Sequence, residues 1–396
     1  MSDASPRPGA GTGDYLDPRA LAAAWLARLP RSETGYAEAF DPSWREIGEG
    51  ERTMLCQSRL AYVFVHAGIL GVVGAAEAGS EAIERMDRHF WNEGARGWIR
   101  SIGTDGRPAD TRIDSYDQAF GLLALAWAYR ATRKASLREK ALAALAGLDE
   151  ASRELKLEGY PEWRPSEGGG AWPDSLVPRR QNPHMHLLEA FLAWTEADPA
   201  GPWLAKAEAM VELAHRRFID PGDGILGEFF DQGLSPLPGA PGRHREPGHQ
   251  FEWVWLLRRW WEASGDEGAF ATASRLYRFA CDNGRDLDGL SFDVVDPEGK
   301  IVADSKLLWP QTEMIKAHAA WYEWGRADAD RLAARRAALE AIDRIRDDYL
   351  LPGEALWHSQ LGRDRAPLPM PTLSRLLYHL FLSLVEAERV FGPRGA

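Results

Sequence analysis

Cysteine is scarce in this chain, since its 396 residues include only Cys56 and Cys281, both in apolar surroundings. Two such thiols cannot form the disulfide framework of a small secreted domain, and they lack the spacing of a cysteine-based zinc site. We therefore expect two buried free thiols and a cytoplasmic protein. Residues 1–13 are rich in Gly, Ala, Pro and Asp and have no apolar core. They predict a disordered tail and not a signal peptide.

The chain also lacks long hydrophobic runs and an excess of positive charge. No apolar stretch is long enough to span a membrane. Acidic residues outnumber Lys and Arg by 59 to 47, which gives a net charge of −12. Because an acidic protein repels the phosphate backbone of nucleic acid, we expect neither nucleic acid nor a membrane as partner. Glycine-rich phosphate loops and nucleophile elbows are missing as well, and we expect no cofactor. A homodimer remains open.

What the chain has instead is an internal repeat. Long Gly/Pro-rich stretches lead into helices that open with polar residues near positions 54, 114, 182, 247, 309 and 371. Repetition at a near-constant period indicates one structural unit used several times. Hydrophobic periodicity of 3.6 residues predicts helices at 18–30, 54–78, 80–92, 114–132, 135–153, 182–196, 201–218, 248–263, 267–283, 310–325, 328–349 and 371–391.

These helices alternate between short turns and long connections. One short turn is expected at Gly79-Ser80, and turn residues at Gly103–Gly106 and Asp296–Gly299 predict β-hairpins within the long connections. If helix 18–30 pairs with helix 371–391, six inner and six outer helices close into a ring. We therefore expect an all-α fold, a single domain over residues 14–396, with small hairpins in its long loops. An open solenoid of helix pairs shares the local pattern but more often has short, uniform connections.

Two of the inner helices begin with a His-x-x-Glu pattern. His249 lies in the first turn of one helix, and Glu252 follows on the same face, where its carboxylate could orient the imidazole and raise the pKa of His249. One repeat earlier, Asn182 and His186 share a helix face, with Glu189 three residues further on. Such pairs can also bind a metal, but two of them do not specify one, and we expect none.

His184 is rotated by roughly 200° from His186 on an ideal helix, so only one of the two can face the lumen squarely. We expect that residue to be His186.

A third candidate is an arginine in an apolar stretch. Arg59 is costly to bury unless it is paired or functional, and its planar guanidinium suits an oxygen-rich ligand. The competing interpretation is a structural ion pair with Asp117, which follows Tyr116 at the start of another inner helix. Arg243 and Arg245 are the arginines that could hold an anionic group on a substrate.

The last two inner helices supply the remaining candidates. Trp309, Gln311 and Glu313 lie at the start of one, and His379 lies in the otherwise apolar final helix. A lone histidine in such a helix is usually a core residue, but its place in the sixth unit makes a lumen position competitive. Indole rings stack well on apolar sugar faces, so tryptophans beside the connections are candidate carbohydrate contacts. These are Trp98, Trp172, Trp309 and Trp357.

Taken together, these motifs resemble the N-acylglucosamine 2-epimerase superfamily, which includes mannose isomerases and cellobiose 2-epimerases. The resemblance runs from Arg-Leu-Ala-Tyr-Val-Phe at 59 to Tyr-His-Leu at 379. It implies an (α/α)6 barrel. It also implies a lumen arginine at Arg59, a lumen histidine at His186, the Gly-His-x-x-Glu-Trp motif at His249 and Glu252, a sugar-stacking Trp309 and a catalytic His379.

The resemblance further implies proton transfer next to a sugar carbonyl. We expect His379, His249, Arg59 and Glu252 to be catalytic, with His379 as the base at C2, His249 as acid and base, and an enediolate stabilised by Arg59. The remaining candidates would bind a monosaccharide: Asn182, His186, Trp309, Gln311, Tyr116, Asp117, Glu313 and Arg243.

The segment Gln-Asn-Pro-His-Met-His-Leu resembles mannose isomerases more than N-acylglucosamine or disaccharide epimerases. The resemblance therefore implies isomerisation of D-mannose to D-fructose, with 2-epimerisation as the alternative. Two other classes stay open. An inverting glycoside hydrolase on the same barrel would use two carboxylates such as Asp117 and Glu313. A non-catalytic helical scaffold would need none of the lumen histidines.

Overall fold

The computed structural model describes residues 14–48, 50–166 and 177–393. The predicted tail at 1–13 and Trp172 lie outside these ranges. Within them the chain forms twelve α-helices, namely α1 (Pro18–Arg28), α2 (Met54–Ile69), α3 (Ala75–His89), α4 (Ser115–Thr132), α5 (Ala135–Glu154), α6 (Asn182–Ala197), α7 (Trp203–Leu213), α8 (Pro247–Ser264), α9 (Gly268–Asn283), α10 (Leu308–Trp324), α11 (Asp328–Arg344) and α12 (Leu377–Phe391).

Short strands lie in the long connections. They are β1 (Arg31–Ser32), β2 (Gly35–Tyr36), β3 (Ala39–Phe40), β4 (Arg52–Thr53), β5 (Trp91–Asn92), β6 (Gly97–Trp98), β7 (Ser101–Ile102), β8 (Pro108–Asp110), β9 (Ile113–Asp114), β10 (Trp163–Arg164), β11 (Arg179–Arg180), β12 (Phe229–Phe230), β13 (Val294–Val295), β14 (Ile301–Ala303), β15 (Lys306–Leu307), β16 (Gln360–Leu361) and β17 (Thr372–Leu373). The predicted hairpins are confirmed, because β7 pairs with β8 and β13 with β14.

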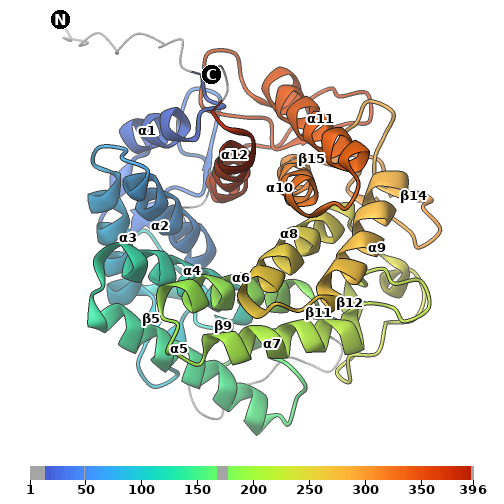
Figure 1. Cartoon of the computed structure of the whole chain (residues 1–396). Coiled ribbons are helices and arrows are strands. Elements are labelled where there is room, and N and C mark those ends of the chain that lie inside the picture. The colour runs from blue at the N-terminus through green and yellow to red at the C-terminus, as the bar shows by residue number, and fades with distance from the viewer. Residues whose placement is uncertain (1–13, 49, 167–176, 394–396) are drawn as a thin grey trace, which may run out of the picture.

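The helices close into the expected ring (Figure 1). Helices α2, α4, α6, α8, α10 and α12 contact one another in that order, and α12 returns to α2. The other six helices lie outside them, and α1 packs on both α12 and α2, which completes the sixth pair. The fold is therefore an (α/α)6 barrel and not an open solenoid.

Burial separates the two layers. In α2 every residue from Cys56 to Ala67 is buried, because the helix has the outer layer on one side and the lumen on the other. In α3 the buried residues are Ala75, Ala78, Gly79, Ala82, Ile83 and Met86, which recur at the 3.6-residue period of one helix face. Both cysteines are free thiols, with Cys56 buried and Cys281 partly buried.

One predicted turn was wrong. Helix α2 ends at Ile69 and α3 begins at Ala75, so the turn lies at 70–74, where Gly71 and Gly74 adopt positive φ. Gly79 lies inside α3, where an added Cβ would approach the side chain of Val65 to 2.6 Å. The glycine therefore permits close helix packing and does not mark a turn.

The final helix also begins later than expected. β17 and a 3-10 turn (Ser374–Leu376) occupy the first residues of the predicted helix, and α12 starts at Leu377.

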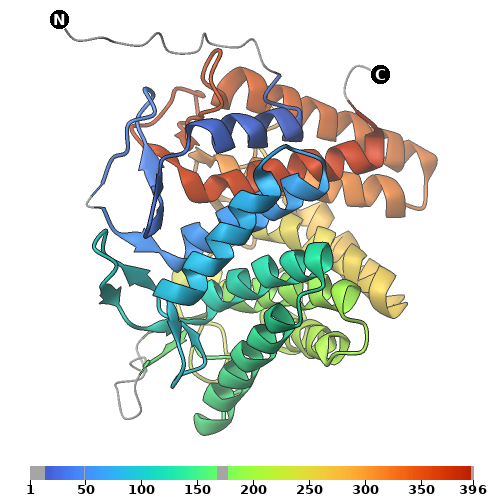
Figure 2. The ribbon, with the colours of Figure 1, turned by 90° about the vertical axis from the view of Figure 1, so that its left-hand side faces the viewer.

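The strands gather at one end of the barrel (Figure 2). In five of the six repeats the strand that leads into an inner helix pairs with a strand elsewhere in the connections, as β4 with β7, β9 with β10, β11 with β12, β15 with β16 and β17 with β3. Before α8 a single bridge between Arg245 and Val295 takes this place. The pairing brings the N-termini of all six inner helices to this end.

A glutamine repeats in the same way. Gln57, Gln118, Gln250 and Gln311 are each the fourth residue of an inner helix. Each side-chain amide accepts a hydrogen bond from the backbone N–H of one loop residue and donates another to its carbonyl, at Tyr36, Trp98, Leu226 and Ser291 respectively. Because a side-chain amide mimics the peptide group, it extends the strand pairing into the helix and fixes the preceding loop.

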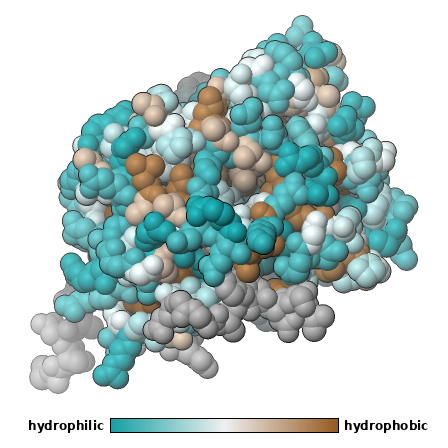
Figure 3. Space-filling model, turned by 90° about the horizontal axis from the view of Figure 1, so that it is seen from below, coloured by the Kyte–Doolittle hydropathy of each residue, from teal (hydrophilic) through white to brown (hydrophobic). Residues whose placement is uncertain are grey.

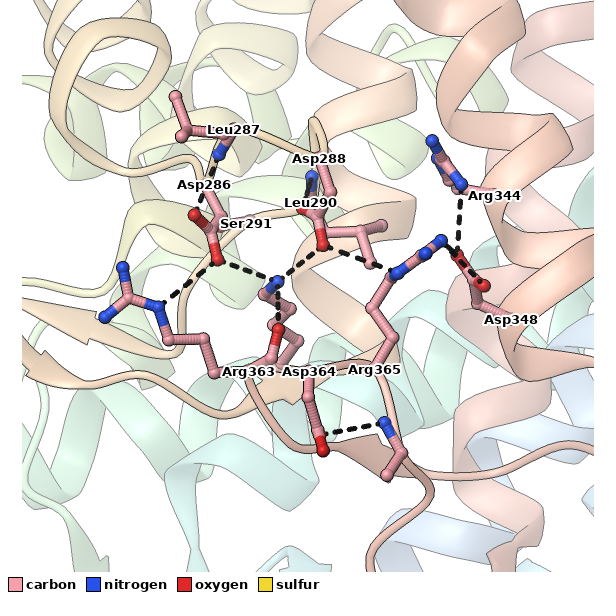
Figure 4. Close-up of polar contacts among 12 residues, drawn as sticks. Asp286, Leu287, Asp288, Leu290, Ser291, Arg344, Asp348, Arg363, Asp364 and Arg365 are labelled. Atoms are coloured by element: carbon pink, nitrogen blue, oxygen red, sulfur yellow. Dashed lines mark hydrogen bonds and ion pairs between the residues drawn. The ribbon is translucent and has the colours of Figure 1, made fainter.

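An ion-pair network fixes the loop before α10 (Figure 4). Lys306 is fully buried, and its Nζ lies 2.7 Å from Asp288, 3.0 Å from Asp286 and 3.0 Å from the carbonyl of Arg363. Arg365 extends the network to Asp348. The network ties three separate loops together directly before Trp309.

The outer surface is mostly hydrophilic where α5 and α7 lie, with hydrophobic side chains scattered among the polar ones (Figure 3). None of the helices that the structure describes combines the length and the hydropathy needed to cross a membrane.

Candidate active site

A cavity of about 470 Å³ opens where the inner helices begin. Nine of the predicted site residues line it, and they come from all six inner helices. These residues are Arg59, Tyr116, Asp117, Asn182, His186, His249, Glu252, Trp309 and His379.

The three other predicted site residues do not line the cavity. Glu313 is fully buried behind His379. The amide of Gln311 is used by the backbone of Ser291 and Leu307, so its role is structural. Arg243 is half exposed and pairs with Asp296 and Glu298 on the outer surface.

His379 is held by a carboxylate. Its Nδ1 lies 2.8 Å from Oε1 of Glu313, whose second oxygen lies 2.6 Å from Nζ of the buried Lys316. Burial, together with the positive charges of Arg59 and Lys316, lowers the pKa of His379 well below 6.5. His379 is therefore neutral near pH 7. When the Nδ1–H group of His379 donates a hydrogen bond to Glu313, Nε2 carries a lone pair that can accept a proton.

The pKa of His249 is shifted in the opposite direction. Its Nδ1 lies 2.9 Å from Glu228 and 3.4 Å from Glu246. Burial alone would lower the pKa of His249, but these two carboxylates raise it to about 10. His249 is therefore an imidazolium that can donate a proton. The expected orienting role of Glu252 was wrong, because Glu228, from the loop before α8, makes the hydrogen bond.

Trp309 lies next to both histidines. Its ring centroid is 4.8 Å from that of His249 and 6.0 Å from that of His379. Both imidazoles thus lie close to one indole ring in the same cavity. Gly248 makes room for the indole, since a Cβ there would come within 2.5 Å of Cζ3 of Trp309.

Glu252 lies lower in the cavity beside Lys316 and His186, at 3.9 and 3.8 Å. Neither of its oxygens has a hydrogen-bond partner in the part of the chain that the structure describes. Burial, reinforced by the nearby charge of Glu313, raises the pKa of Glu252 well above its usual value. A protonated Glu252 can donate a hydrogen bond to an oxygen placed above it.

His186 faces the lumen, as expected, while His184 does not. Nδ1 of His186 lies 3.2 Å from Glu189, and burial lowers the pKa of His186 to about 4. His184 instead accepts a hydrogen bond from the backbone of Tyr160 and fixes the loop, as the repeated glutamines do.

Arg59 is buried in the cavity wall and forms no ion pair with Asp117, which was the competing interpretation. Its guanidinium donates to the hydroxyl of Tyr116 at 2.8 Å and to the carbonyl of Arg375 at 3.3 Å. It also packs over the rings of Phe120 and Tyr378. A planar cation with aromatic neighbours can stabilise a developing oxyanion.

Sequence reasoning missed several charged residues of this site, among them Lys316, Glu228, Arg100, Arg180 and Arg375. Lys316 could have been found, because a lysine inside the apolar segment Met314–Ala317 carries the same signal as Arg59. Glu228 lies in a connection and not in a helix, so the helical periodicity gave no signal for it. Arg100, Arg180 and Arg375 lie at the ends of connections whose course the sequence does not reveal. Arg100, Arg180 and Arg375 line the cavity, whereas Arg245 packs within its own loop.

Among the residues that the structure describes, three groups of side chains are close enough to hold a cation, namely His186 with Glu189 and Glu252, His249 with Glu228 and Glu246, and His379 with Glu252 and Glu313. In the last group the ammonium of Lys316 already lies 2.6 Å from Glu313 and supplies a positive charge. The absence of a resident metal stays a prediction.

Comparison with known proteins identifies the family of this chain. The model of the family "N-acylglucosamine 2-epimerase (GlcNAc 2-epimerase)" matches residues 35–383. A mannose-6-phosphate isomerase of Rhizobium meliloti is 32% identical over 378 residues, covering 89% of this chain and 90% of the relative. A D-mannose isomerase of Thermobifida fusca is 26% identical and covers 92% and 93%.

The fold has equally clear relatives among solved structures. The cellobiose 2-epimerase of Bacillus thermoamylovorans superposes with a TM-score of 0.81 at 19% identity, over 92% of this chain and 95% of that one. The barrel and its histidine-lined cavity thus define a carbohydrate isomerase or epimerase. The chain belongs to the N-acylglucosamine 2-epimerase family, as the sequence motifs predicted.

Proposed function

We propose that this enzyme interconverts an aldose and a ketose, with D-mannose and D-fructose as the basic pair. The observation that carries the proposal is the pair of histidines with opposite pKa shifts, both packed beside Trp309 in one cavity. Titratable groups whose environments push their pKa values apart define an acid and a base in one site. The relatives named as isomerases of mannose or its phosphate support this sugar configuration.

The proton transfers follow from these charges. His379 removes the proton from C2 of the open-chain aldose, while His249 protonates O1, which gives an enediol. His249 then takes the proton of O2 and His379 delivers its proton to C1, which gives the ketose and restores both residues. Arg59 stabilises the oxygen charge that develops. Trp309 stacks on the sugar, while Asn182, His186, Tyr116 and Asp117 bind its hydroxyls.

The same residues bear on the alternative outcome, 2-epimerisation. An epimerase must return the proton to C2 from the opposite face of the sugar. His249, whose pKa is raised to about 10, is protonated and exchanges protons with the oxygen atoms of the sugar. His379 is then the one neutral base that moves the carbon-bound proton. This asymmetry favours the isomerase. The cellobiose 2-epimerase relatives keep epimerisation as the second candidate.

An inverting hydrolase finds less support in the site. Asp117 lines the cavity, but the other carboxylate that such a mechanism would use, Glu313, is fully buried and is engaged by His379 and Lys316.

The deciding experiment is incubation with D-mannose carrying deuterium at C2. We expect fructose with part of the deuterium at C1, because one base carries it between adjacent carbons. Glucose formation with exchange at C2 would instead establish the epimerase. Reducing sugar released only from a glycoside would establish the hydrolase, and full retention of mannose without turnover contradicts the proposal.

We further propose that the protein is cytoplasmic and has no nucleic-acid partner. The two free thiols support the first statement, and the net charge of −12 supports the second. Whether it forms a homodimer stays a prediction, which the solution mass would check.

A further inference from the structure

A second cavity opens at the other end of the barrel, where the inner helices end. Its volume is about 480 Å³, and residues from all six inner helices line it, together with Arg19 of α1 and Pro393. The cavity of the candidate active site lies at the N-terminal ends of the same helices, so the two cavities occupy opposite ends of one barrel. We call the second one the distal cavity.

Glu386, near the end of α12, lines the distal cavity and is only 8% exposed. Burial alone would raise the pKa of Glu386, but the charges of Arg389 and Arg259 lower it. The guanidinium of Arg389 lies 3.1 Å from its carboxylate. Glu386 is thus a carboxylate ion near pH 7, at the boundary between the distal cavity and the barrel core.

The carboxylate of Glu386 holds one indole of the core. Trp255 of α8 is 2% exposed and donates its Nε1–H to Oε2 of Glu386 at 3.1 Å. The ring of Trp255 in turn contacts the buried ammonium of Lys316, whose Nζ lies 4.1 Å from the ring centroid. A carboxylate at the indole N–H fixes the ring in place, and its negative charge strengthens the attraction between the ring face and a cation.

Lys316 depends on this indole because its other contacts are incomplete. Its Nζ lies 2.6 Å from Glu313 and 3.9 Å from Glu252, yet it has no hydrogen bond of favourable geometry within the described ranges of the chain. A buried ammonium is costly unless its surroundings compensate for the lost water. The face of Trp255 is therefore part of what keeps the ammonium beside Glu313.

Glu313 connects Lys316 to His379. Its Oε1 lies 2.8 Å from Nδ1 of His379, and its Oε2 lies 2.6 Å from Nζ of Lys316. A displaced ammonium would release one oxygen of Glu313 and weaken the positive charge near the imidazole. An unbroken series of contacts thus joins Glu386 at the distal cavity to the base of the candidate active site.

Other charged and titratable groups also face His379, from four inner helices. They are Arg59 of α2, His186 and Glu189 of α6, Glu252 of α8, and Glu313 and Lys316 of α10. In the part of the chain that the structure describes, the side chain of Glu386 has hydrogen bonds and ion pairs only with Trp255 and Arg389. Its contacts with the base therefore run through Trp255.

We propose that Glu386 is a positioning residue for the base His379, and that it acts through Trp255 and Lys316. This inference rests on the proposed function and adds to it a residue that contacts neither the sugar nor the reacting atoms. The distal end of the barrel then contributes to the electrostatics of the active site at the other end.

The test compares the wild-type enzyme with Glu386→Leu, which removes the acceptor of the indole N–H. We expect kcat for the preferred aldose to fall by roughly two- to thirtyfold, the range that one cation–π contact spans, with KM little changed. The acid limb of the kcat profile should move to higher pH, since a more distant ammonium lets the pKa of His379 rise. Glu386→Gln retains an acceptor for the indole and should recover most of kcat.

Glu388→Leu is the matched control. Glu388 lies on the same helix, lines the same cavity and pairs with an arginine, Arg19, at 2.8 Å, whereas the indole of Trp255 is bound to Glu386. This variant should keep the wild-type kcat and acid limb. Equal losses in Glu386→Leu and Glu388→Leu would be a general loosening of the barrel end and would overturn the proposal.

Trp255→Phe shows whether Glu386 acts through the indole, because phenylalanine keeps an aromatic face but has no N–H for the carboxylate. Residues that act through one another have non-additive effects, so Glu386→Leu should change kcat little further in the Trp255→Phe background. Effects that multiply overturn the proposal. If Glu386→Leu does not fold, Trp255→Phe alone decides: a raised acid limb supports the proposal and a wild-type acid limb overturns it.

The pKa of His379, measured by NMR titration of ring-labelled histidine, needs no substrate and separates this inference from the proposed function. A folded Glu386→Leu with the wild-type pKa of His379 overturns the positioning role even if the enzyme is an isomerase. An enzyme that turns over no aldose overturns the proposed function. A raised pKa of His379 in Glu386→Leu, absent from Glu388→Leu, supports the positioning role in either case.

Discussion

Nδ1 of His379 lies 2.8 Å from Oε1 of Glu313, although the two residues are 66 positions apart. This contact leaves the other imidazole nitrogen of His379 free to accept a carbon-bound proton. We predict that His379→Asn lowers kcat by about 10²–10⁴-fold, the usual contribution of a general base, with a smaller change in KM. Steady-state kinetics with the preferred aldose checks this.

His358→Asn is the control for that prediction, because His358 does not line the cavity. Equal activity of His379→Asn and the wild-type enzyme would remove His379 from the mechanism.

Lys316 should act on His379 through its charge. It is fully buried, and its ammonium lowers the pKa of His379 while opposing the raised pKa of Glu313. In Lys316→Met the pKa of His379 should rise, so the base becomes protonated at a higher pH and the acid limb of the kcat profile moves upward. Removing one partner of a buried ion pair should also cost roughly 3–5 kcal/mol of stability.

Lys316→Arg keeps the charge and is expected to restore the acid limb at least in part. An unshifted acid limb in Lys316→Met, measured on folded protein, would show that Lys316 only supports the fold.

The alkaline limb of the pH–rate profile should report the loss of the proton from His249. Because His249 acts as an acid, it must be protonated, and its pKa of about 10 predicts activity that persists through pH 9 and falls above pH 10. Glu228→Gln removes a carboxylate that raises this pKa, so the alkaline limb should move to lower pH. A pH–rate profile of both enzymes suffices, and coincident alkaline limbs would contradict the assignment.

The same shift contributes to stability. A pKa raised from 6.5 in the folded state stabilises the protein fully below pH 6.5, and this contribution is lost as the pH rises through about 10. Urea unfolding at pH 6 and pH 9 should therefore show a larger pH-dependent loss for the wild-type protein than for Glu228→Gln.

A substitution at Gln311 distinguishes a structural role of this residue from a substrate-binding role. Its amide satisfies the backbone of Ser291 and Leu307 in a fully buried position. Gln311→Leu should lower the free energy of unfolding by roughly 2–4 kcal/mol, because three hydrogen bonds are lost and the loop groups are left unpaired. A raised KM with unchanged stability would instead support the sequence-based interpretation of Gln311 as a sugar ligand.

Gly248 should control the position of Trp309. An added Cβ would come within 2.5 Å of the indole, so Gly248→Ala must displace the ring. We expect KM to rise, with the helix itself slightly favoured by alanine. Gly94→Ala, at an open loop position whose Cβ would meet nothing closer than 3.5 Å, is the control. Unchanged KM in Gly248→Ala would argue against stacking on Trp309.

Much of the fold was predictable because its signals are local. The six polar helix starts, the apolar faces and the turn residues at Gly103–Gly106 and Asp296–Gly299 each act within a few residues of chain. The helix boundary between α2 and α3 was missed because Gly79 serves a contact with Val65, which is a tertiary requirement.

For the site, the sequence identified the residues that the repeat itself places in the lumen. His186, His249, Trp309 and His379 all lie at inner helices whose starts converge once the ring closes. The partner of His249 could not be identified in this way, since Glu252 is near in sequence whereas Glu228 reaches it from a loop.

By itself, then, the amino-acid sequence determined the ring of helix pairs, the family and the histidines of the lumen, because periodic burial and short motifs are properties of neighbouring residues. Only the tertiary structure decided which carboxylate holds which histidine, and that Arg100, Arg180 and Arg375 line one cavity while Arg243 lies outside it. The physical reason is that charges interact through space, and the long loops set those distances.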